Sequence, residues 1–112
     1  MIPKPVVPRA AARADAERAL DHYLAEASPE VALAFIDALE ATYAAIGAAP
    51  GAGSPRWAHE LGLPGLRSLR VRGYPWLVFY FETEDHGDVW RILHARRDIP
   101  TGMEGVGPEG EA

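Results

Sequence analysis

The stretch Trp-Leu-Val-Phe-Tyr-Phe-Glu, residues 76 to 82, decides the fold of this chain. Branched and aromatic side chains fill it, and these residue types pack well on a pleated sheet. Side chains point alternately to the two faces of a strand, so a half-buried strand alternates apolar with polar residues. This stretch is apolar at both odd and even positions until Glu82, so we expect each of its two faces to be covered by other residues or to bind a partner. We therefore predict that it is the central strand of a sheet.

Two further strand-like runs flank the central one. Residues 66 to 72 precede it across a Gly-Tyr-Pro turn, and residues 89 to 94 follow it across a short polar turn that contains Gly87. Short turns between consecutive strands are typical of an antiparallel meander. The second half of the chain is therefore predicted to form three antiparallel strands.

The first half of the chain predicts two helices. Small and apolar residues recur at spacings of three or four from residue 9 to residue 27, with charged residues between them. Ser28, Pro29 and Glu30 then form a helix start, because Ser caps free amides and Pro is tolerated in the first turn. A second apolar stripe follows and ends at Gly47. The connection is so short that the helices must form a hairpin.

The fold class predicted from these elements is α+β. Val6 and Val7 lie among Pro residues, which leaves room for only a short edge strand before the helices. Neither a helical hairpin nor a three-stranded sheet is stable alone, so the hairpin must cover one face of the sheet. We expect a helical hairpin packed on a small antiparallel sheet.

Length and composition indicate one domain. The chain has 112 residues, 48% of them hydrophobic, and no Cys, so disulfides and thiolate metal sites are excluded. We expect a single domain over residues 1 to 99 and a flexible acidic, Gly-rich tail over residues 100 to 112. The sequence shows neither a targeting leader nor an apolar run of membrane-spanning length, so the expected location is the cytoplasm, with no membrane partner.

Ordinary cofactor motifs are missing. Residues 48 to 57 are Gly- and Pro-rich, but Gly51 and Gly53 are followed by Pro55 and not by the Lys-Ser/Thr pair of a phosphate-binding loop. This segment is expected to be a connecting loop. The four His residues are scattered without ligand spacing, so neither a metal nor a cofactor is expected.

Arg residues gather in the second half of a chain whose formal net charge is -5. That net charge argues against a general nucleic-acid binder. Residues 61 to 81 nevertheless contain three Arg and no acidic residue, and the stretch Val-Trp-Arg-Ile-Leu-His-Ala-Arg-Arg-Asp-Ile-Pro, residues 89 to 100, places more in an apolar strand. The planar fork of Arg suits a carboxylate, a phosphate or an aromatic face. A general coding preference for Arg would give the same composition.

The alternation of side chains along a strand predicts the face of the sheet on which each Arg lies. Arg70 and Arg72 share one face and Arg67 takes the other, so at least one Arg from each outer strand should lie beside the central aromatics. We expect the face away from the helices to be a cationic, aromatic surface suited to an acidic or aromatic protein segment, or to nucleic acid. The alternative is that these Arg residues are solvated or paired with acids such as Glu82 and Asp88. The residues predicted to bind a partner or target are Arg67, Arg70, Arg72, Trp76, Tyr80, Arg91, His94, Arg96 and Arg97.

The order of elements and three short stretches resemble a known family. The stretches are Pro-Gly-Leu-Arg-Ser at residues 64 to 68, Trp-Leu-Val-Phe-Tyr at residues 76 to 80, and Arg-Ile-Leu-His-Ala-Arg-Arg-Asp at residues 91 to 98. The last is similar to the "R-V-L-H-G-A-R-D" ending of the ParE branch of the ParE/RelE toxin superfamily. The resemblance covers roughly residues 6 to 99.

This resemblance implies the toxin of a type II toxin-antitoxin system. Such a toxin is neutralised by a small ParD-like antitoxin that wraps its surface, and operator DNA is contacted only through the antitoxin. ParE-like members poison DNA gyrase, whereas RelE-like members cut mRNA on the ribosome. A locally positive face on this chain leads us to expect an acidic and apolar toxin-binding segment in the antitoxin.

The residues bear on which branch applies. Cleavage of RNA needs groups that transfer protons beside groups that stabilise the phosphate charge. RelE-like sites supply them with Lys, Arg and often a C-terminal Tyr, but this chain has no Lys in the predicted sheet and no Tyr, Lys or Arg after Asp98. We therefore predict a non-catalytic inhibitor of gyrase. Two alternatives stay open: a ribosome-dependent nuclease that uses His94, Arg91 and Arg67, and a non-toxic antitoxin-binding remnant.

Overall fold

The computed structural model describes residues 2 to 96 and residue 99. The predicted tail and the candidate Arg97 lie outside these residues. Within them the elements are, in chain order, β1 (Val6–Pro8), α1 (Ala10–Glu26), α2 (Pro29–Ala48), the 3-10 turn η1 (Pro50–Ala52), α3 (Arg56–Leu61), β2 (Arg67–Arg70), β3 (Trp76–Glu82) and β4 (Gly87–His94).

The sheet has the strand order β1-β4-β3-β2. Strands β2, β3 and β4 form the predicted antiparallel meander, and β1 is the predicted short edge strand. β1 runs parallel to β4, with Val6 opposite Gly87, so the sheet is mixed rather than purely antiparallel. Parallel neighbours need a long connection. The helical hairpin and the first two strands of the meander supply it.

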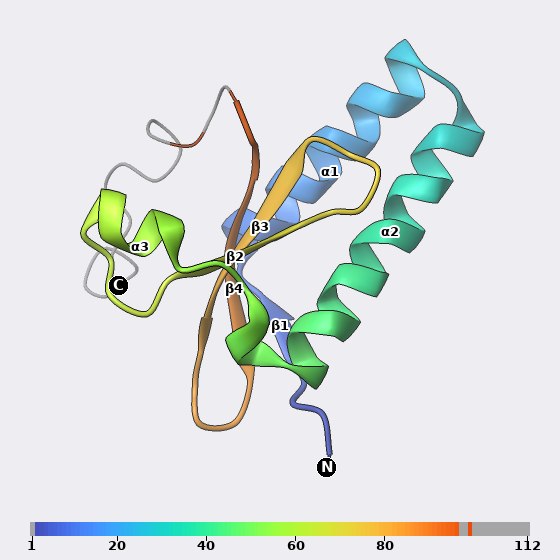
Figure 1. Ribbon diagram of the computed structural model, residues 1–112. Helices are drawn as coiled ribbons and strands as arrows, with labels where there is room; N and C mark the ends of the chain where they lie inside the picture. The colour runs from blue at the N-terminus through green and yellow to red at the C-terminus, as the bar shows by residue number, and fades with distance from the viewer. Residues whose placement is uncertain (1, 97–98, 100–112) are drawn as a thin grey trace.

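The helical hairpin forms as the sequence indicates. Ser28 caps α2 by accepting a hydrogen bond from the Val31 amide at 3.2 Å, and Pro29 occupies the first turn. The Tyr74 hydroxyl, in the turn between β2 and β3, donates to the Val31 carbonyl at 2.9 Å. α1 and α2 lie together on one side of the sheet (Figure 1).

Both faces of β3 are buried, as predicted for the central strand. On the hairpin side, Val78 and Tyr80 pack with Phe35 of α2 in the main core. On the other side, Phe79 belongs to a second cluster, whose fully or nearly buried members are Leu66, Phe79, Leu93 and Ile99. Trp57 and Leu61 of α3 pack on this second cluster.

The second cluster corrects one expectation. The face away from the hairpin is not an open surface, because α3 lies over it on the opposite side of the sheet from α1 and α2 (Figure 1). The loop expected over residues 48 to 57 is also shorter than predicted, since η1 and the start of α3 fall inside it. A six-residue helix that begins after Pro55 is too short to produce a periodic apolar pattern. Gly62, with φ of 65°, ends it in the left-handed region.

The expectation that no apolar run reaches membrane-spanning length is corrected by α2, which is long and apolar enough, by length and composition, to cross a membrane. Its residues Phe35, Leu39 and Ile46 are buried in the main core.

Candidate partner-binding site

Arg91 of β4 is bound by a buried carboxylate on α1. Its Nε donates to Asp15 Oδ2 at 2.7 Å and a terminal nitrogen donates to Asp15 Oδ1 at 2.9 Å, while the Ile92 amide also donates to Oδ2 at 2.9 Å. β1 ends at Pro8, so the outer edge of β4 has no strand partner beyond Val89. The carboxylate of Asp15 takes that place. The predicted site residue Arg91 is therefore used inside the fold.

Arg67 and Tyr80 also form hydrogen bonds within the fold. The Tyr80 hydroxyl donates to the Pro50 carbonyl at 2.6 Å and accepts from the Gly53 amide at 3.1 Å. Arg67 donates to the Gly53 carbonyl at 2.8 Å. Burial raises the pKa of Tyr80, although the Gly53 amide and the Arg67 charge act in the opposite direction. Tyr80 is fully buried, so the prediction that it contacts a partner is wrong: its ring fills the main core.

Trp76 and His94 lie together at one end of the sheet. The indole Nε1 of Trp76 donates to the Tyr23 hydroxyl at 2.8 Å. The Trp76 and His94 rings pack edge-to-face, with 5.5 Å between their centres. His94 Nδ1 accepts from the Arg96 amide at 3.2 Å. Both rings are half-buried, and the Arg96 side chain is exposed. These residues can offer an aromatic and cationic edge to a partner.

The structure does not bring together the three groups of the nuclease alternative. β3 separates Arg67 on β2 from Arg91 on β4, and the two guanidinium groups turn to different partners, the loop carbonyl and α1. His94 is opposite Trp76, whereas Arg67 is opposite Tyr80. Trp76 and Tyr80 are four residues apart on β3, which places His94 and Arg67 about 13 Å apart along the strand direction.

A cluster that the sequence did not indicate joins the start of α1 to β4. Arg9 donates to both carboxylate oxygens of Asp88, at 3.0 and 2.8 Å, and its guanidinium lies 4.2 Å from the centre of the Trp90 ring. The Trp90 indole donates to the same carboxylate at 3.0 Å. Burial alone would raise the pKa of Asp88, but these hydrogen bonds and the Arg9 charge outweigh it and lower the pKa.

Asp15 is one of the charged residues between positions 9 and 27 that were expected to lie between the apolar positions of the first helix, on its exposed face. It is buried together with Ala12 and Ala19. The signal was present, because positions 12, 15 and 19 follow the three- and four-residue spacing of a single helical stripe. A charge on that stripe indicates a buried partner, which here is Arg91.

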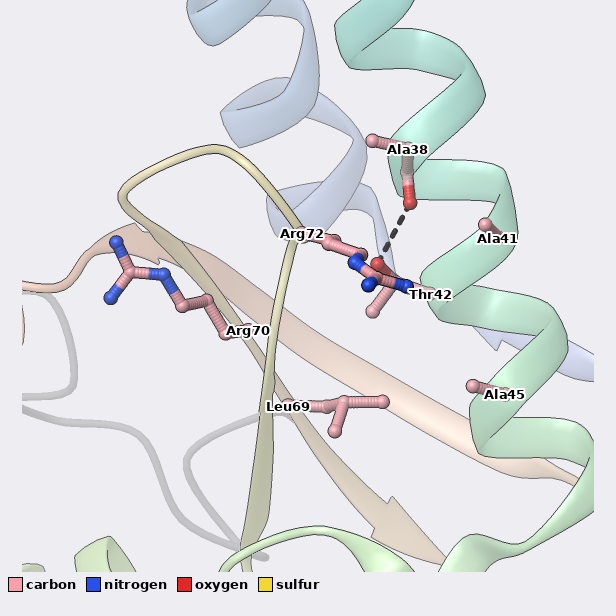
Figure 2. A pocket seen from close by; sticks show the side chains of 7 residues that line it. All are labelled: Ala38, Ala41, Thr42, Ala45, Leu69, Arg70 and Arg72. Atoms are coloured by element: carbon pink, nitrogen blue, oxygen red, sulfur yellow. Dashed lines mark hydrogen bonds between the residues drawn. The ribbon is translucent and has the colours of Figure 1, made fainter.

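A groove of about 410 Å³ runs between α2 and the edge of β2 (Figure 2). Its lining is Ala38, Ala41, Thr42, Ala45, Leu69, Arg70 and Arg72. In Figure 2 the Arg72 side chain reaches toward α2 beside Thr42, whereas the Arg70 side chain points to the other side of the strand. The prediction that Arg70 and Arg72 share one face is therefore wrong, because β2 ends at Arg70 and strand alternation does not extend to Arg72. The Thr42 hydroxyl donates to the Ala38 carbonyl at 2.8 Å. Arg72 forms no ion pair with any described residue, so its charge is available to a ligand.

Eight of the nine predicted site residues thus fall into three groups. Arg67, Tyr80 and Arg91 hold the fold together from within. Arg70 and Arg72 lie beside the groove, and Trp76, His94 and Arg96 lie at the far end of the sheet. Arg97 is outside the described residues.

Comparisons with known proteins agree with this fold. The family model described as "ParE toxin of type II toxin-antitoxin system, parDE" matches residues 6–99. A solved structure titled "Chromosomal ParDE TA system from P. aeruginosa" contains a similar chain, with 23% sequence identity and a TM-score of 0.68, over 80% of this chain and 92% of that one. The curated proteins include no match. Because the family model covers most of the sequence, from β1 to the end of the meander, the chain belongs to the ParE toxin family of type II toxin-antitoxin systems.

Proposed function

We propose that this ParE-family toxin inhibits DNA gyrase by binding alone and that a ParD-type antitoxin neutralises it. The toxin acts in the cytoplasm, and operator DNA is contacted only through the antitoxin. Family membership supports the choice of target and of antitoxin.

One observation carries the non-catalytic part of the proposal. Ribonuclease chemistry needs proton-transfer and charge-stabilising groups within reach of one phosphate. Arg67 and Arg91 are each hydrogen-bonded to a different part of the fold, on opposite sides of β3, and His94 lies at the end of β4. In the described part of the chain these groups do not converge, which supports inhibition by binding.

The proposed binding surface is smaller than the sequence suggested. It consists of the exposed Arg70, Arg72 and Arg96 with the half-buried Trp76 and His94. Arg97 joins this proposal on the sequence alone. Arg67 and Arg91 support the surface from inside the fold.

The test is plasmid supercoiling by purified gyrase with the toxin added, run beside actively translating ribosomes scored for mRNA cleavage. We expect loss of supercoiling, or trapped linear plasmid, while the mRNA stays intact. Addition of the antitoxin should restore supercoiling. Cut mRNA with normal supercoiling would instead identify a ribosome-dependent nuclease, and no effect in either assay would identify a non-toxic protein.

A further inference from the structure

The two ends of the sheet differ in charge. At one end, the turn from β3 to β4, residues 82 to 88 include Glu and Asp but neither Lys nor Arg. Toward the other end, residues 66 to 81 and 89 to 96 include Arg but neither Glu nor Asp. Trp76 and Glu82 are the first and last residues of β3, so the ends lie about 20 Å apart along the strand. We call residues 82 to 88 the acidic end of the sheet.

Three Arg residues gather at the opposite end. β2 ends at Arg70, and Arg72 follows it in the turn to β3. The Ala95 amide donates to the Pro75 carbonyl at 2.8 Å, which holds the residues after β4 against this same turn and places Arg96 beside it. All three Arg residues are exposed. They form the cationic end of the sheet.

The positive charges at the cationic end are not neutralised by the part of the fold that the structure describes. None of the ion pairs between described residues includes Arg70, Arg72 or Arg96. The Arg70 side chain donates to the Tyr74 carbonyl at 3.1 Å, and a carbonyl carries no net charge. The cationic end therefore presents these charges to a ligand.

The three side chains do not converge on one point. Figure 2 shows that Arg72 reaches toward α2 whereas Arg70 points to the other side of the strand, and Arg96 comes from the segment after β4. One carboxylate cannot meet all of them. A DNA duplex instead offers a regular series of separate phosphates, and the planar fork of an Arg side chain suits a phosphate. The spread of the charges therefore favours a nucleic-acid backbone over a single acidic side chain.

We propose that the cationic end of the sheet binds the phosphate backbone of the DNA that gyrase holds, with the acidic end pointing away from it. Arg70, Arg72 and Arg96 each contribute a charge-assisted hydrogen bond to a phosphate oxygen. The inference rests on the proposed function, which names gyrase as the target. It concerns DNA bound to gyrase and not operator DNA.

The charges also explain why gyrase has to hold the DNA. The chain has a formal net charge of -5, and its acidic end is repelled by phosphates, so a few phosphate contacts give only weak binding to free DNA. Gyrase supplies the remaining contacts. The opposite charges of the two ends orient the toxin as it approaches, with the cationic end toward the duplex.

The test compares binding of the full-length toxin to purified gyrase alone and to gyrase loaded with a linear duplex, at about 50 and 200 mM salt. Arg70→Gln and Arg96→Gln each remove one charge from the cationic end, and Arg96→Lys keeps the charge. Arg13→Gln makes the same change at an exposed position of α1, and Glu84→Gln changes the acidic end. Circular dichroism checks that each variant is folded.

We expect the unchanged toxin to bind gyrase more tightly when the duplex is present. On this complex, Arg70→Gln and Arg96→Gln should each weaken binding by about three- to tenfold. Each should also reduce the slope of log affinity against log salt by about 1. Neither should change binding to gyrase alone, and Arg96→Lys, Arg13→Gln and Glu84→Gln should bind like the unchanged toxin in both forms.

Other results would overturn the inference in distinguishable ways. Equal losses of affinity with and without DNA would show that the cationic end binds an acidic surface of gyrase itself, which leaves the proposed function standing. Unchanged affinity and salt slope in both Gln variants would exclude the cationic end as a contact. If the unchanged toxin neither binds gyrase nor alters supercoiling, the proposed function fails, and the inference fails with it.

Discussion

Gly53 lies directly against the hydroxyl group of Tyr80, so closely that a Cβ atom at Gly53 would collide with the phenol. The same two residues are joined by a hydrogen bond of 3.1 Å from the Gly53 amide to the Tyr80 oxygen. The phenol of Tyr80 thus attaches the loop after α2 to the main core.

Gly53→Ala should destabilise the fold by about 1 to 3 kcal/mol, because an added methyl group must displace a fully buried ring. The free energy of unfolding in urea measures the effect. Gly51→Ala is the matched control, since a Cβ atom there would meet nothing within 4 Å. Equal stability of the two variants would contradict the packing described for Gly53.

Tyr80→Phe removes the hydrogen bonds to Pro50 and Gly53 but keeps the ring in the core. We expect a loss of about 1 to 3 kcal/mol in unfolding free energy, because two polar groups lose their partner. Antitoxin affinity, measured at a temperature where the variant is fully folded, should not change. A large loss of affinity in the folded variant would show that Tyr80 is part of the binding surface.

Asp15→Ala should be among the most damaging single changes in the helices. It removes the buried carboxylate that accepts from the partly buried Arg91 guanidinium and from the Ile92 amide, at a cost of about 3 to 5 kcal/mol. The same change at the exposed Asp21 of α1 is the control. Thermal and urea unfolding measure both. The double variant Asp15→Ala with Arg91→Ala should lose less than the sum of the two single losses, and strict additivity would show that the pair is not coupled.

Asp88 should make the fold sensitive to acid. Its pKa in the folded state is lowered, so its ion pair with Arg9 contributes stability that is present above the unfolded pKa of about 3.9. That contribution is lost as the pH falls through the folded pKa. Asp88→Asn should therefore lower stability at pH 7 and flatten the fall in unfolding free energy between about pH 5 and pH 2. Asp37→Asn, on the exposed side of α2, is the reference, and identical pH profiles for the two variants would refute the assignment.

The sequence predicted the elements whose signals are local. Ser28 and Pro29 marked the start of α2, and apolar residues at both parities marked β3 as an interior strand. The direction of β1 could not be read, because three residues among prolines specify neither a partner nor an orientation. The helix α3 is shorter than two helical turns and has no pattern of its own.

The candidate site was predictable only in part. Arg70 and Arg72 were predicted as site residues and both line the groove, but strand alternation placed them on one face, and their side chains point to opposite sides because β2 ends at Arg70. It could not show that Arg67 and Arg91 are bound internally, because their partners, the Gly53 carbonyl and Asp15, come from distant segments. Asp15 and Ile92 are 77 residues apart in the sequence, and contacts over such a distance cannot be predicted from a local sequence pattern.

The pairing of β1 with β4 has a consequence for synthesis of the chain. Val6 is opposite Gly87, so the first strand to leave the ribosome must wait for the last one before it has a neighbour. At about 5 to 20 residues per second, that wait is on the order of 4 to 16 s. Pairing of such distant segments also slows folding. The nascent chain therefore cannot complete its sheet until β4 has been made.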